Sequence, residues 1–600
     1  MRLRKLAFFA LLLLITSFAF GQTQPTETAA EKEKKKKEFD ERVVQMLDQA
    51  IAEASGLRLA GNRAIVYAVA GDLYWKFDDK RARELFRNSA ADIVTQNLEY
   101  EKQRIESAEP VNLEPFDPFD VRPQIMPLIG KRDAELALEL LVSTRPAKLA
   151  DAMAAGTTDN MMSMRVNQEL ALEQQFALAA ADQDPELAIR LIKDSLAKGV
   201  SHSVLPLLQK LFKKDEKKAN ELGAEVMRRL GDTDLAKSTT EMNVALSFLQ
   251  FGSRPVPANA KEKQFTFTDA QIRELANKVV AALLAPSNNS TQAMSMMSRA
   301  IPILEKIVPD RVQVLRARQA ATQRNLPSDI ARQQQQQRMW DPNSTPEQIL
   351  AMIPKITNEG ERANAYQAVA AKIGQITEDA RAKRLIDQIP DERARANARE
   401  QFETMRLNRL AGTGKLEEAR RSIAGLTDRR RKIQSLVNLA QQHHRRNKEA
   451  DLETAASLMT EAKGLVAEYP EDGDEIDLMM MVVMGYATVE PETAFRMFEP
   501  VVESLNEHTQ AMAVLSKYDK RNRDFRRGEL VMRIHGGPGG NLLLFRYMNQ
   551  MQALGAKDFE RMTTLADRFQ RPDSRMIVKL LVLQAAVNAP QNQPPRPVVF

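Results

Sequence analysis

The chain has 600 residues, of which 43% are hydrophobic and 28% are charged, a balance typical of a globular protein rather than a disordered one. A chain of this length can bury several cores, so we do not expect one compact domain. The absence of cysteine excludes disulfides, thiol catalysis and thiolate metal sites. The formal net charge of +6 falls to +3 (83 basic against 80 acidic residues) without the three basic residues of the leading segment, which gives no case for a nucleic-acid partner.

The leading segment, residues 1–21, has the features of a secretory signal peptide. Three basic residues precede the apolar run Leu6–Phe20, which is shorter than the ~20 residues that a membrane-spanning helix needs. Ala19 and Gly21 place small residues at the −3 and −1 positions of a cleavage site before Gln22. We therefore expect export to the periplasm or the extracellular space, with no transmembrane segment after cleavage; an uncleaved anchor is the alternative.

Helix-favouring residues dominate the rest of the chain, while Gly and Pro gather in a few breaks. The run Glu31–Glu38, EKEKKKKE, is expected to be a solvated lead-in to a first helix near Phe39. Proline-rich and Gln-rich stretches mark the other boundaries. The expected divisions after the signal peptide are a charged lead-in (22–38), an N-terminal helical repeat block (39–250), a linker with a helical segment (251–325), a Gln-rich linker (326–346), a C-terminal helical repeat block (347–587) and a proline-rich tail (588–600).

One pattern recurs between the breaks: an acidic residue, three residues, an alanine, two residues, and then Leu or Met. The acid is expected to be the N-cap of a helix, where it accepts hydrogen bonds from free backbone amides. In two copies Pro185 and Pro491 follow at once, at the first helical position. The alanine would let a neighbouring helix come close, and the larger residue would fill the seam on the same face. The alanines of this pattern, including a looser copy at 419, are Ala82, Ala137, Ala188, Ala219, Ala382, Ala419, Ala455 and Ala494.

The last four of these alanines are 37, 36 and 39 residues apart, which is the period of one helical hairpin. The helices between them are expected to open at Asn358, Asp391 and Asp428, each a polar cap after an apolar residue. The first-half spacings of 55, 51 and 31 indicate degenerate repeats or insertions. The sequence therefore predicts an all-α fold, an α-solenoid of antiparallel helical hairpins in two blocks joined near Gln333.

Two segments carry a family resemblance. Gly414–Ala419, GKLEEA, resembles the turn into the second helix of a tetratricopeptide-like repeat, and Ala70–Tyr74 followed by Ala82 and Phe86 resembles a full repeat shortened by one residue in the turn. The chain is thus similar to the tetratricopeptide-like superfamily of α-solenoids over roughly half its length, although the later repeats exceed ~34 residues and mostly lack the closing proline. The resemblance implies a scaffold of stacked hairpins that binds peptides or proteins, and it carries no catalytic residues.

The run Ile534–Asn541, IHGGPGGN, resembles the oxyanion-hole segment of proline-iminopeptidase-type α/β-hydrolases. That chemistry also needs a G-x-S-x-G nucleophile elbow and a later acid and His. The chain has no G-x-S-x-G, and His535 is the last of its five histidines. We therefore interpret the run as a corner between two helices.

Other possible sites have simpler interpretations. Adjacent His443 and His444 cannot chelate a metal as an i,i+4 pair would, and we expect them to face solvent at a helix end. Methionine clusters could bind a soft metal, but the apolar surroundings of Met479–Met481 favour core packing. The basic stretches Tyr518–Arg527 and Asp428–Lys432 are expected to be solvated helix faces, with contact to an acidic partner or an anionic polymer as the alternative. We predict no catalytic, cofactor or metal site.

These features together predict an exported, non-catalytic scaffold that binds a protein or peptide partner in the cell envelope. The alternative is a helical-superhelix enzyme acting on cell-envelope glycan or peptide, which would need a deep pocket with converging carboxylates. A purely structural part of an envelope complex is a third possibility.

Overall fold

The computed structural model describes residues 28–106, 120–155, 160–236, 238–254, 264–285, 291–324, 344–356, 358–413, 415–446, 448–519, 524–534 and 542–588. The expected signal peptide, the glycine run at 535–541, most of the Gln-rich linker and the last twelve residues of the tail lie outside the described residues. Within the described ranges, no helix is both long enough and apolar enough to cross a bilayer.

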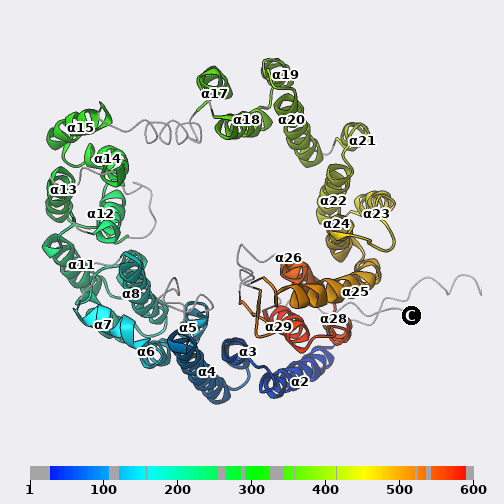
Figure 1. The fold of residues 1–600 in the computed structure, drawn as a ribbon, viewed down its shortest axis with the longest axis horizontal. Helices are drawn as coiled ribbons and strands as arrows, with labels where there is room; N and C mark the ends of the chain where they lie inside the picture. Colours follow the sequence, from blue (N-terminus) through cyan, green and yellow to red (C-terminus); the bar gives the residue numbers. More distant parts are fainter. Residues whose placement is uncertain are drawn as a thin grey trace, which may run out of the picture.

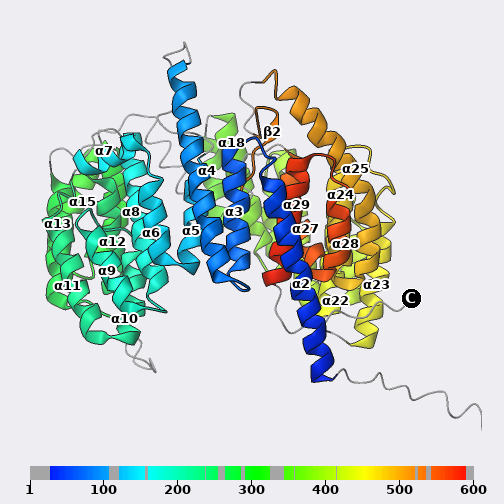
Figure 2. The same ribbon diagram turned by 90° about the horizontal axis from the view of Figure 1, so that it is seen from below.

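The fold is all-α, as the sequence predicts. Of the part that the structure describes, 80% is helix and 1% is strand, and its 27 helices pack in neighbouring pairs. The helices surround an open centre in two layers (Figure 1). Most of their axes run roughly along the axis of this ring (Figure 2).

The first half of the chain supplies one side of the ring (Figure 1). Its helices are α2 (Ala29–Ala54), α3 (Ala60–Tyr74), α4 (Asp79–Glu106), α5 (Arg122–Arg132), α6 (Ala134–Ser143), α7 (Ala147–Ala155), α8 (Asn160–Ala180), α9 (Pro185–Leu196), α10 (Val204–Lys214), α11 (Glu216–Asp232), α12 (Thr239–Gly252), α13 (Asp269–Leu284), α14 (Thr291–Leu304) and α15 (Pro309–Arg324). Helices α13 to α15 occupy much of the segment expected to be a linker, and their apolar side chains join the main core.

The second half supplies the other side. Its elements are α17 (Pro346–Met352), the 3₁₀ turn η2 (Ile353–Lys355), α18 (Glu359–Gly374), α19 (Asp379–Asp387), α20 (Glu392–Thr413), α21 (Leu416–Ala424), α22 (Arg429–Arg446), α23 (Glu449–Lys463), α24 (Gly473–Val489), α25 (Pro491–Leu515), strands β1 (Phe525–Arg526) and β2 (Glu529–Leu530), α26 (Leu543–Arg546), α27 (Met548–Lys557), α28 (Phe559–Ala566) and α29 (Pro572–Asn588). Successive helices alternate between the layers, with α18 and α22 inside and α19, α21 and α23 outside (Figure 1).

Capping explains where many of these helices begin. In four copies of the repeating pattern the aspartate accepts the backbone N–H three residues later at 2.9–3.0 Å; these are Asp78, Asp133, Asp184 and Asp215. Asn358, Asp391 and Asp428 cap α18, α20 and α22 in the same way, as predicted. Glu378 and Glu490 hold the N-cap position without this bond. Asp451 contradicts the pattern, because it lies inside α23 and contacts His443.

The alanines of the pattern lie inside the helix packing. All eight are at most 1% exposed, in α4, α6, α9, α11, α19, α21, α23 and α25. Helices α3 and α4 pack closely at Gly71 of α3, where a Cβ atom would lie only 2.6 Å from the Phe86 ring of α4. Small residues thus bring paired helices together in the first repeat.

Two apolar cores hold the ring. The smaller one joins α17, α18, α19 and the first half of α20. The main core includes the second half of α20, continues through α29, and passes directly to α2 and onward to α15. The order of packing therefore runs from α17 to α29 and then from α2 to α15, so the first and last described helices, α2 and α29, meet inside one core.

The β1–β2 hairpin lies where α2 and α29 meet, on the inner side of α3 and α29 (Figure 1). Its strands pair antiparallel, Arg526 opposite Glu529, around a two-residue turn with positive φ at Arg527 (52°) and Gly528 (76°). This is the geometry of a type I′ turn, which suits the twist of a short hairpin. The prediction of a helix face at 518–527 is therefore wrong for the described residues of this stretch, because α25 ends at Leu515 and Phe525 and Arg526 form β1.

The charged lead-in also differs from expectation. Helix α2 begins at Ala29, ten residues before Phe39, because Thr28 and Glu31 form a capping box. Residues 29–38 stay exposed, as predicted, but they form a helical extension of α2.

Candidate binding surface on the inner face of the ring

The inner layer presents one exposed stripe on each of several helices. On α18 the buried residues cluster on one side, and Asn364, Gln367 and Ala371 lie exposed on the other. Helix α18 itself lies on the inner side of α17 and α19 (Figure 1). The side-chain amides of Asn364 and Gln367 have no partner among the described residues.

Helix α22 carries a similar stripe. Gln434, Asn438 and Gln441 lie on its least buried side, opposite Leu436 and Ala440. The Gln434 Nε2 donates to Asn438 Oδ1 at 2.9 Å, so two of these amides already form a short ladder along the helix. Helix α22 lies on the inner side of α23 (Figure 1).

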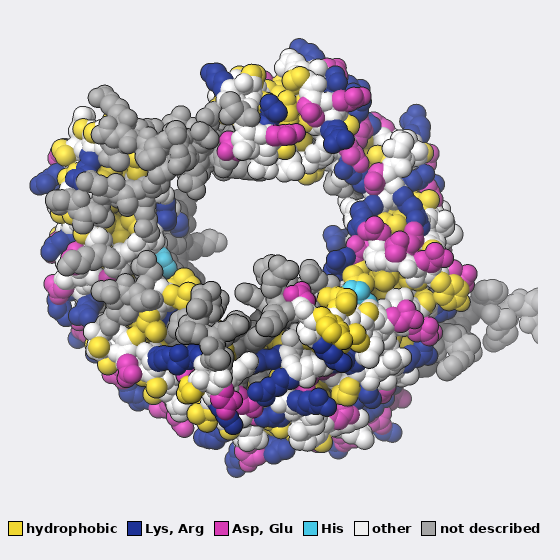
Figure 3. Space-filling model, in the orientation of Figure 1, with side chains coloured by type: hydrophobic (Ala, Val, Ile, Leu, Met, Phe, Trp, Pro, Cys, Tyr) yellow, Lys and Arg dark blue, Asp and Glu magenta, His cyan; other side chains and the backbone are white. Residues whose placement is uncertain are grey.

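The opposite wall has the same chemistry. On α8 the exposed residues include Gln168 and Gln175. On α12, Gln250 is exposed, and Asn243 and Ser247 are partly buried. Both helices lie in the inner layer (Figure 1), and the space-filling view shows the opening that they help to surround (Figure 3). We call the exposed and partly exposed amide side chains of these four helices the amide stripes: Gln168, Gln175, Asn243, Gln250, Asn364, Gln367, Gln434, Asn438 and Gln441.

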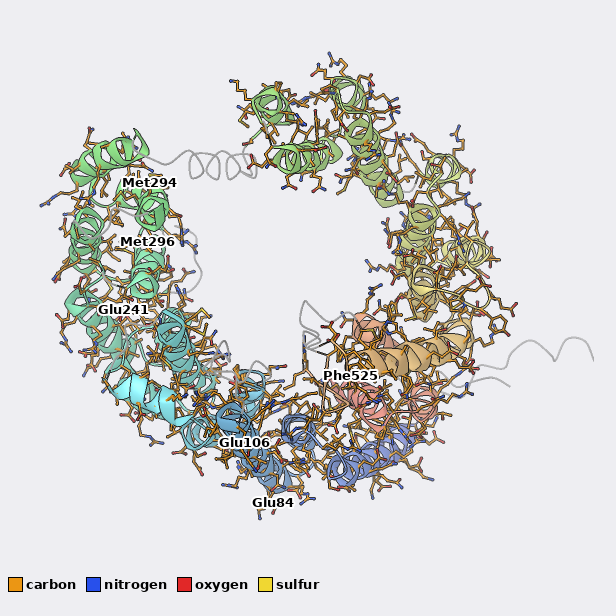
Figure 4. The ribbon with its side chains drawn as sticks, in the orientation of Figure 1. Glu84, Glu106, Glu241, Met294, Met296 and Phe525 are labelled. Carbon is orange, nitrogen blue, oxygen red and sulfur yellow. The ribbon has the colours of Figure 1, made fainter. Side chains whose placement is uncertain are left out.

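The outer layer differs in charge. On α11, for example, Arg228 pairs with Glu225 at 2.5 Å and with Asp232 at 3.1 Å, and on α4 Arg81 pairs with Glu84 at 3.0 Å. Glu84 projects from the outer rim of the ring, whereas Phe525 of the hairpin lies toward its inner side (Figure 4). Charged side chains on α11 and α4 thus pair with one another in the outer layer.

A cavity of about 280 Å³ adjoins the stripe of α8. Gln175 and Phe176 form one side, and Lys131 of α5 and Lys210 of α10 lie around it. Lys210 is neutralised by Asp182 at 2.6 Å. The cavity therefore combines an apolar floor with a polar rim.

A buried charge network fixes α8 in place. Arg122 donates to both carboxylate oxygens of Glu169 at 2.6 and 2.7 Å, and both side chains are at most 4% exposed. Arg145 bridges Glu169 and Glu173 at 2.7 and 2.8 Å, and Lys198 completes the chain at Glu173. Because every buried charge has an opposite partner, the network orients the helix without leaving an uncompensated ion.

A second cluster joins α22, α24 and α26. Asp477 accepts hydrogen bonds from Arg546 at 3.1 Å and from the Tyr547 hydroxyl, and Arg430 lies 3.3 Å away. Burial alone would raise the pKa of Asp477, but the bonds from Tyr547 and Arg546 outweigh burial and lower it. Burial and the bond to Asp477 raise the pKa of Tyr547. Both groups thus stay in the protonation state that holds the three helices together.

The structure corrects two interpretations of candidate sites. His443 does not face solvent: it is 4% exposed, and its Nδ1 lies 2.6 Å from Asp451 Oδ1. The stretch at 428–432 is not simply solvated, because Arg429 pairs with Glu475, and Arg431 with Glu400. Two arginines of this stretch thus pair with carboxylates of the chain itself.

The methionine cluster Met479–Met481 was predicted to pack in the core. Met479 and Met480 are buried and Met481 packs against the core, so core packing of this cluster is confirmed. Met294 and Met296 belong to α14 in the inner layer (Figure 4). Across the described ranges, no group of three or more His, Asp or Glu side chains is placed to hold a metal ion.

No sequence pattern identified the amide stripes as a candidate binding surface. Their signal is weak, since a Gln or Asn on a helix is common and only the inner position of the helix gives it meaning. No protein-family model matches the chain, and none of the curated proteins matches it either, so the tetratricopeptide-like resemblance stays a prediction.

Proposed function

We propose that this protein is an exported, non-catalytic scaffold of tetratricopeptide-like helical hairpins that holds an extended polypeptide segment of a partner against its inner face. The observation that carries the proposal is the set of amide stripes on α8, α12, α18 and α22, which are helices of the inner layer. A side-chain amide offers two donors and one acceptor group, which matches the alternating N–H and C=O groups of an extended backbone. Neutral amides would bind backbone with little selection for charge.

An enzyme acting on glycan or peptide is less well supported. Acid–base hydrolysis of that kind uses two carboxylates that converge on one bond. The cavity beside α8 has one carboxylate, Asp182, and Lys210 already neutralises it. The cavity therefore suits binding better than hydrolysis. Residence in the periplasm or outside the cell is part of the proposal and follows from the predicted signal peptide.

The test removes amides from the inner wall. A variant with Asn364→Ala, Gln367→Ala, Gln434→Ala and Asn438→Ala should bind extended, uncharged peptides at least 10-fold more weakly than the native chain. Each lost backbone bond is worth about 0.5–1.5 kcal/mol, and together they exceed one factor of ten. Fluorescence anisotropy with labelled Ser/Thr/Ala-rich peptides gives the affinity, and capture from an envelope extract shows whether natural partners follow.

The control removes exposed amides from the outer layer. Asn220→Ala on α11 and Gln388→Ala at the end of α19 change the same chemistry away from the centre. Equal loss of binding in both variants, or no loss in the inner one, would refute the proposal. Circular dichroism establishes that each variant keeps its helices.

A further inference from the structure

The cavity beside α8 lies among three neighbouring helices. Helix α8 packs on both α5 and α10, and the cavity of about 280 Å³ is formed where they meet. The structure describes every residue that lines it. Its polar wall and the small residue beside it consist of Lys131 of α5, Gln175 and Ala179 of α8, Asp182 and Gln183 just after α8, and Lys210 of α10.

A close contact between α5 and α8 fixes the floor of this cavity. Phe176 is 1% exposed, and a Cβ atom at Gly130 would lie only 2.5 Å from its ring. Gly130 therefore lets the ring lie directly against the backbone of α5. Because a ring packed in this way has little room to move, the cavity is formed before any ligand arrives, and binding requires little rearrangement.

The charged groups around the cavity leave one positive charge without a counter-ion. Lys210 lies 2.6 Å from Asp182, so these two charges neutralise each other. Lys131 is exposed and has no hydrogen-bond or ion-pair partner among the described residues, whereas its neighbour Arg132 pairs with Asp72 at 2.6 Å. Two lysines against one aspartate give the lining a net charge of +1.

Two glutamines add hydrogen-bond donors that are not in use. The side chains of Gln175 and Gln183 are exposed and have no partner in the part of the chain that the structure describes. Each amide offers two N–H donors, and the Lys131 ammonium offers three. A carboxylate carries one negative charge on two accepting oxygens, so it matches both the net charge and the donors of the cavity.

We propose that the cavity binds one acidic side chain, the carboxylate of an Asp or Glu, of the extended segment that the protein holds. This inference rests on the proposed function, because Gln175 belongs both to the amide stripes and to the wall of the cavity. A segment that lies on the amide stripes passes the cavity along its length, so a side chain reaches into it without the segment ending there. The cavity adds a selection that neutral amides lack, and it fixes which residue of the segment lies beside Gln175.

Peptides that differ at one position test this assignment. Three Ser/Thr/Ala-rich peptides with acetylated and amidated ends carry Glu, Gln or Lys at the same central position, and a fourth carries Gln there and a free C-terminal carboxylate. By fluorescence anisotropy the native chain should bind the Glu peptide about 5-fold more tightly than the amidated Gln peptide, which corresponds to about 1 kcal/mol for an exposed ion pair. Added salt should reduce this preference, because the charges are open to solvent.

Substitutions at the cavity provide the discriminating measurements. Lys131→Gln should bind the Glu and Gln peptides equally, and Lys131→Glu should prefer the Lys peptide to the Glu peptide. Ala179→Leu places extra carbons in the wall of the cavity, so it should lose the preference for Glu while it still binds the Gln peptide. Lys193→Gln removes an exposed charge from α9 that does not line the cavity, and this control should keep the native preference. Urea midpoints establish that each variant is folded.

The outcomes separate this inference from the proposed function. Equal affinity of the native chain for the Glu and Gln peptides, or a preference for Glu that survives Lys131→Gln, would overturn the assignment of the cavity. Tighter binding of the peptide with the free C-terminal carboxylate than of the amidated Glu peptide would also overturn it, because the cavity would then hold a chain end. Failure of every peptide to bind the native chain would instead refute the proposed function itself.

Discussion

At the scale of single residues, His508 on α25 links stability to pH. Its Nδ1 is buried without a hydrogen-bond partner in the described part of the chain, and burial together with the charge of Arg546 lowers the pKa of His508. The unfolded chain therefore takes up more protons than the folded one as the pH falls through about 6.5. The folded state loses stability in that range, because protonation of the partly buried imidazole is disfavoured there.

Replacing this histidine should reduce the pH dependence. The urea midpoint of the native protein should fall when the pH is lowered from about 7.5 to about 5.5, and it should fall less in His508→Gln. The difference between the two proteins isolates His508, because the other histidines titrate in both. Identical shifts would show that His508 has the same pKa in both states.

The alanines of the repeating pattern test helix packing at the same scale. Ala382→Leu should destabilise the protein by about 1–3 kcal/mol, because the added carbons have no space in a position that is 0% exposed. Ala380 lies in the same helix, α19, but is exposed, so Ala380→Leu is the matched control and should change stability little. Denaturant midpoints compare the two, and equal effects would contradict the packing role of the pattern.

At the scale of elements, the sequence predicts those helix starts that depend only on neighbouring residues. Asp133, Asp184 and Asp215 cap their helices as expected because an aspartate with three helix-forming residues after it satisfies free amides without outside help. The pattern fails at Asp451, since α23 begins at Glu449, two residues earlier, and the carboxylate instead binds His443. A tertiary contact there outweighs the capping preference.

Local sequence does not predict the amide stripes, nor the closing seam, which is the contact of α2 and α3 with α28, α29 and the β1–β2 hairpin. The hairpin turn at Arg527 and Gly528 lacks the Asn-Gly signal of its type, and its strands have two residues each. The structural role of Glu529 depends on its hydrogen bond from Asn62, which is 467 positions away in the sequence. Likewise, a glutamine such as Gln434 becomes part of a surface only once α22 is known to lie inside α23.

Glu529 gives a prediction for the element that closes the ring. Glu529→Ala should destabilise the closing seam by about 1–3 kcal/mol or more, because buried N–H donors from Arg58, Leu59 and Asn62 lose their acceptor. Hydrogen exchange should accelerate in α2 and α3 and remain unchanged in α18. Glu503→Ala, at an exposed position of α25, is the control. Uniform acceleration across the chain would mean that the seam is not a separate unit.

At the scale of the whole molecule, the order of packing differs from the order of the sequence. The sequence suggests two blocks joined near Gln333, whereas the main core joins the same two regions through α2 and α29. Buried contact of α29 with α2 and α3 therefore links the two halves in addition to the backbone. Such contact requires both halves, since α29 packs on α2 and α3 and each would otherwise expose an apolar face.

Cutting the chain tests this arrangement. Co-expressed fragments 28–324 and 344–588 should purify as a 1:1 complex, because the closing seam buries Lys579, Glu529 and the Phe39–Phe559 contact between them. Glu529→Ala in the second fragment should weaken the complex at least 10-fold, consistent with a loss of about 1–3 kcal/mol. Analytical ultracentrifugation measures the association, and circular dichroism of each fragment alone shows whether it is helical. Two helical fragments that sediment separately would mean that only the backbone between Arg324 and Ser344 holds the halves together, and the ring would then be open at its seam.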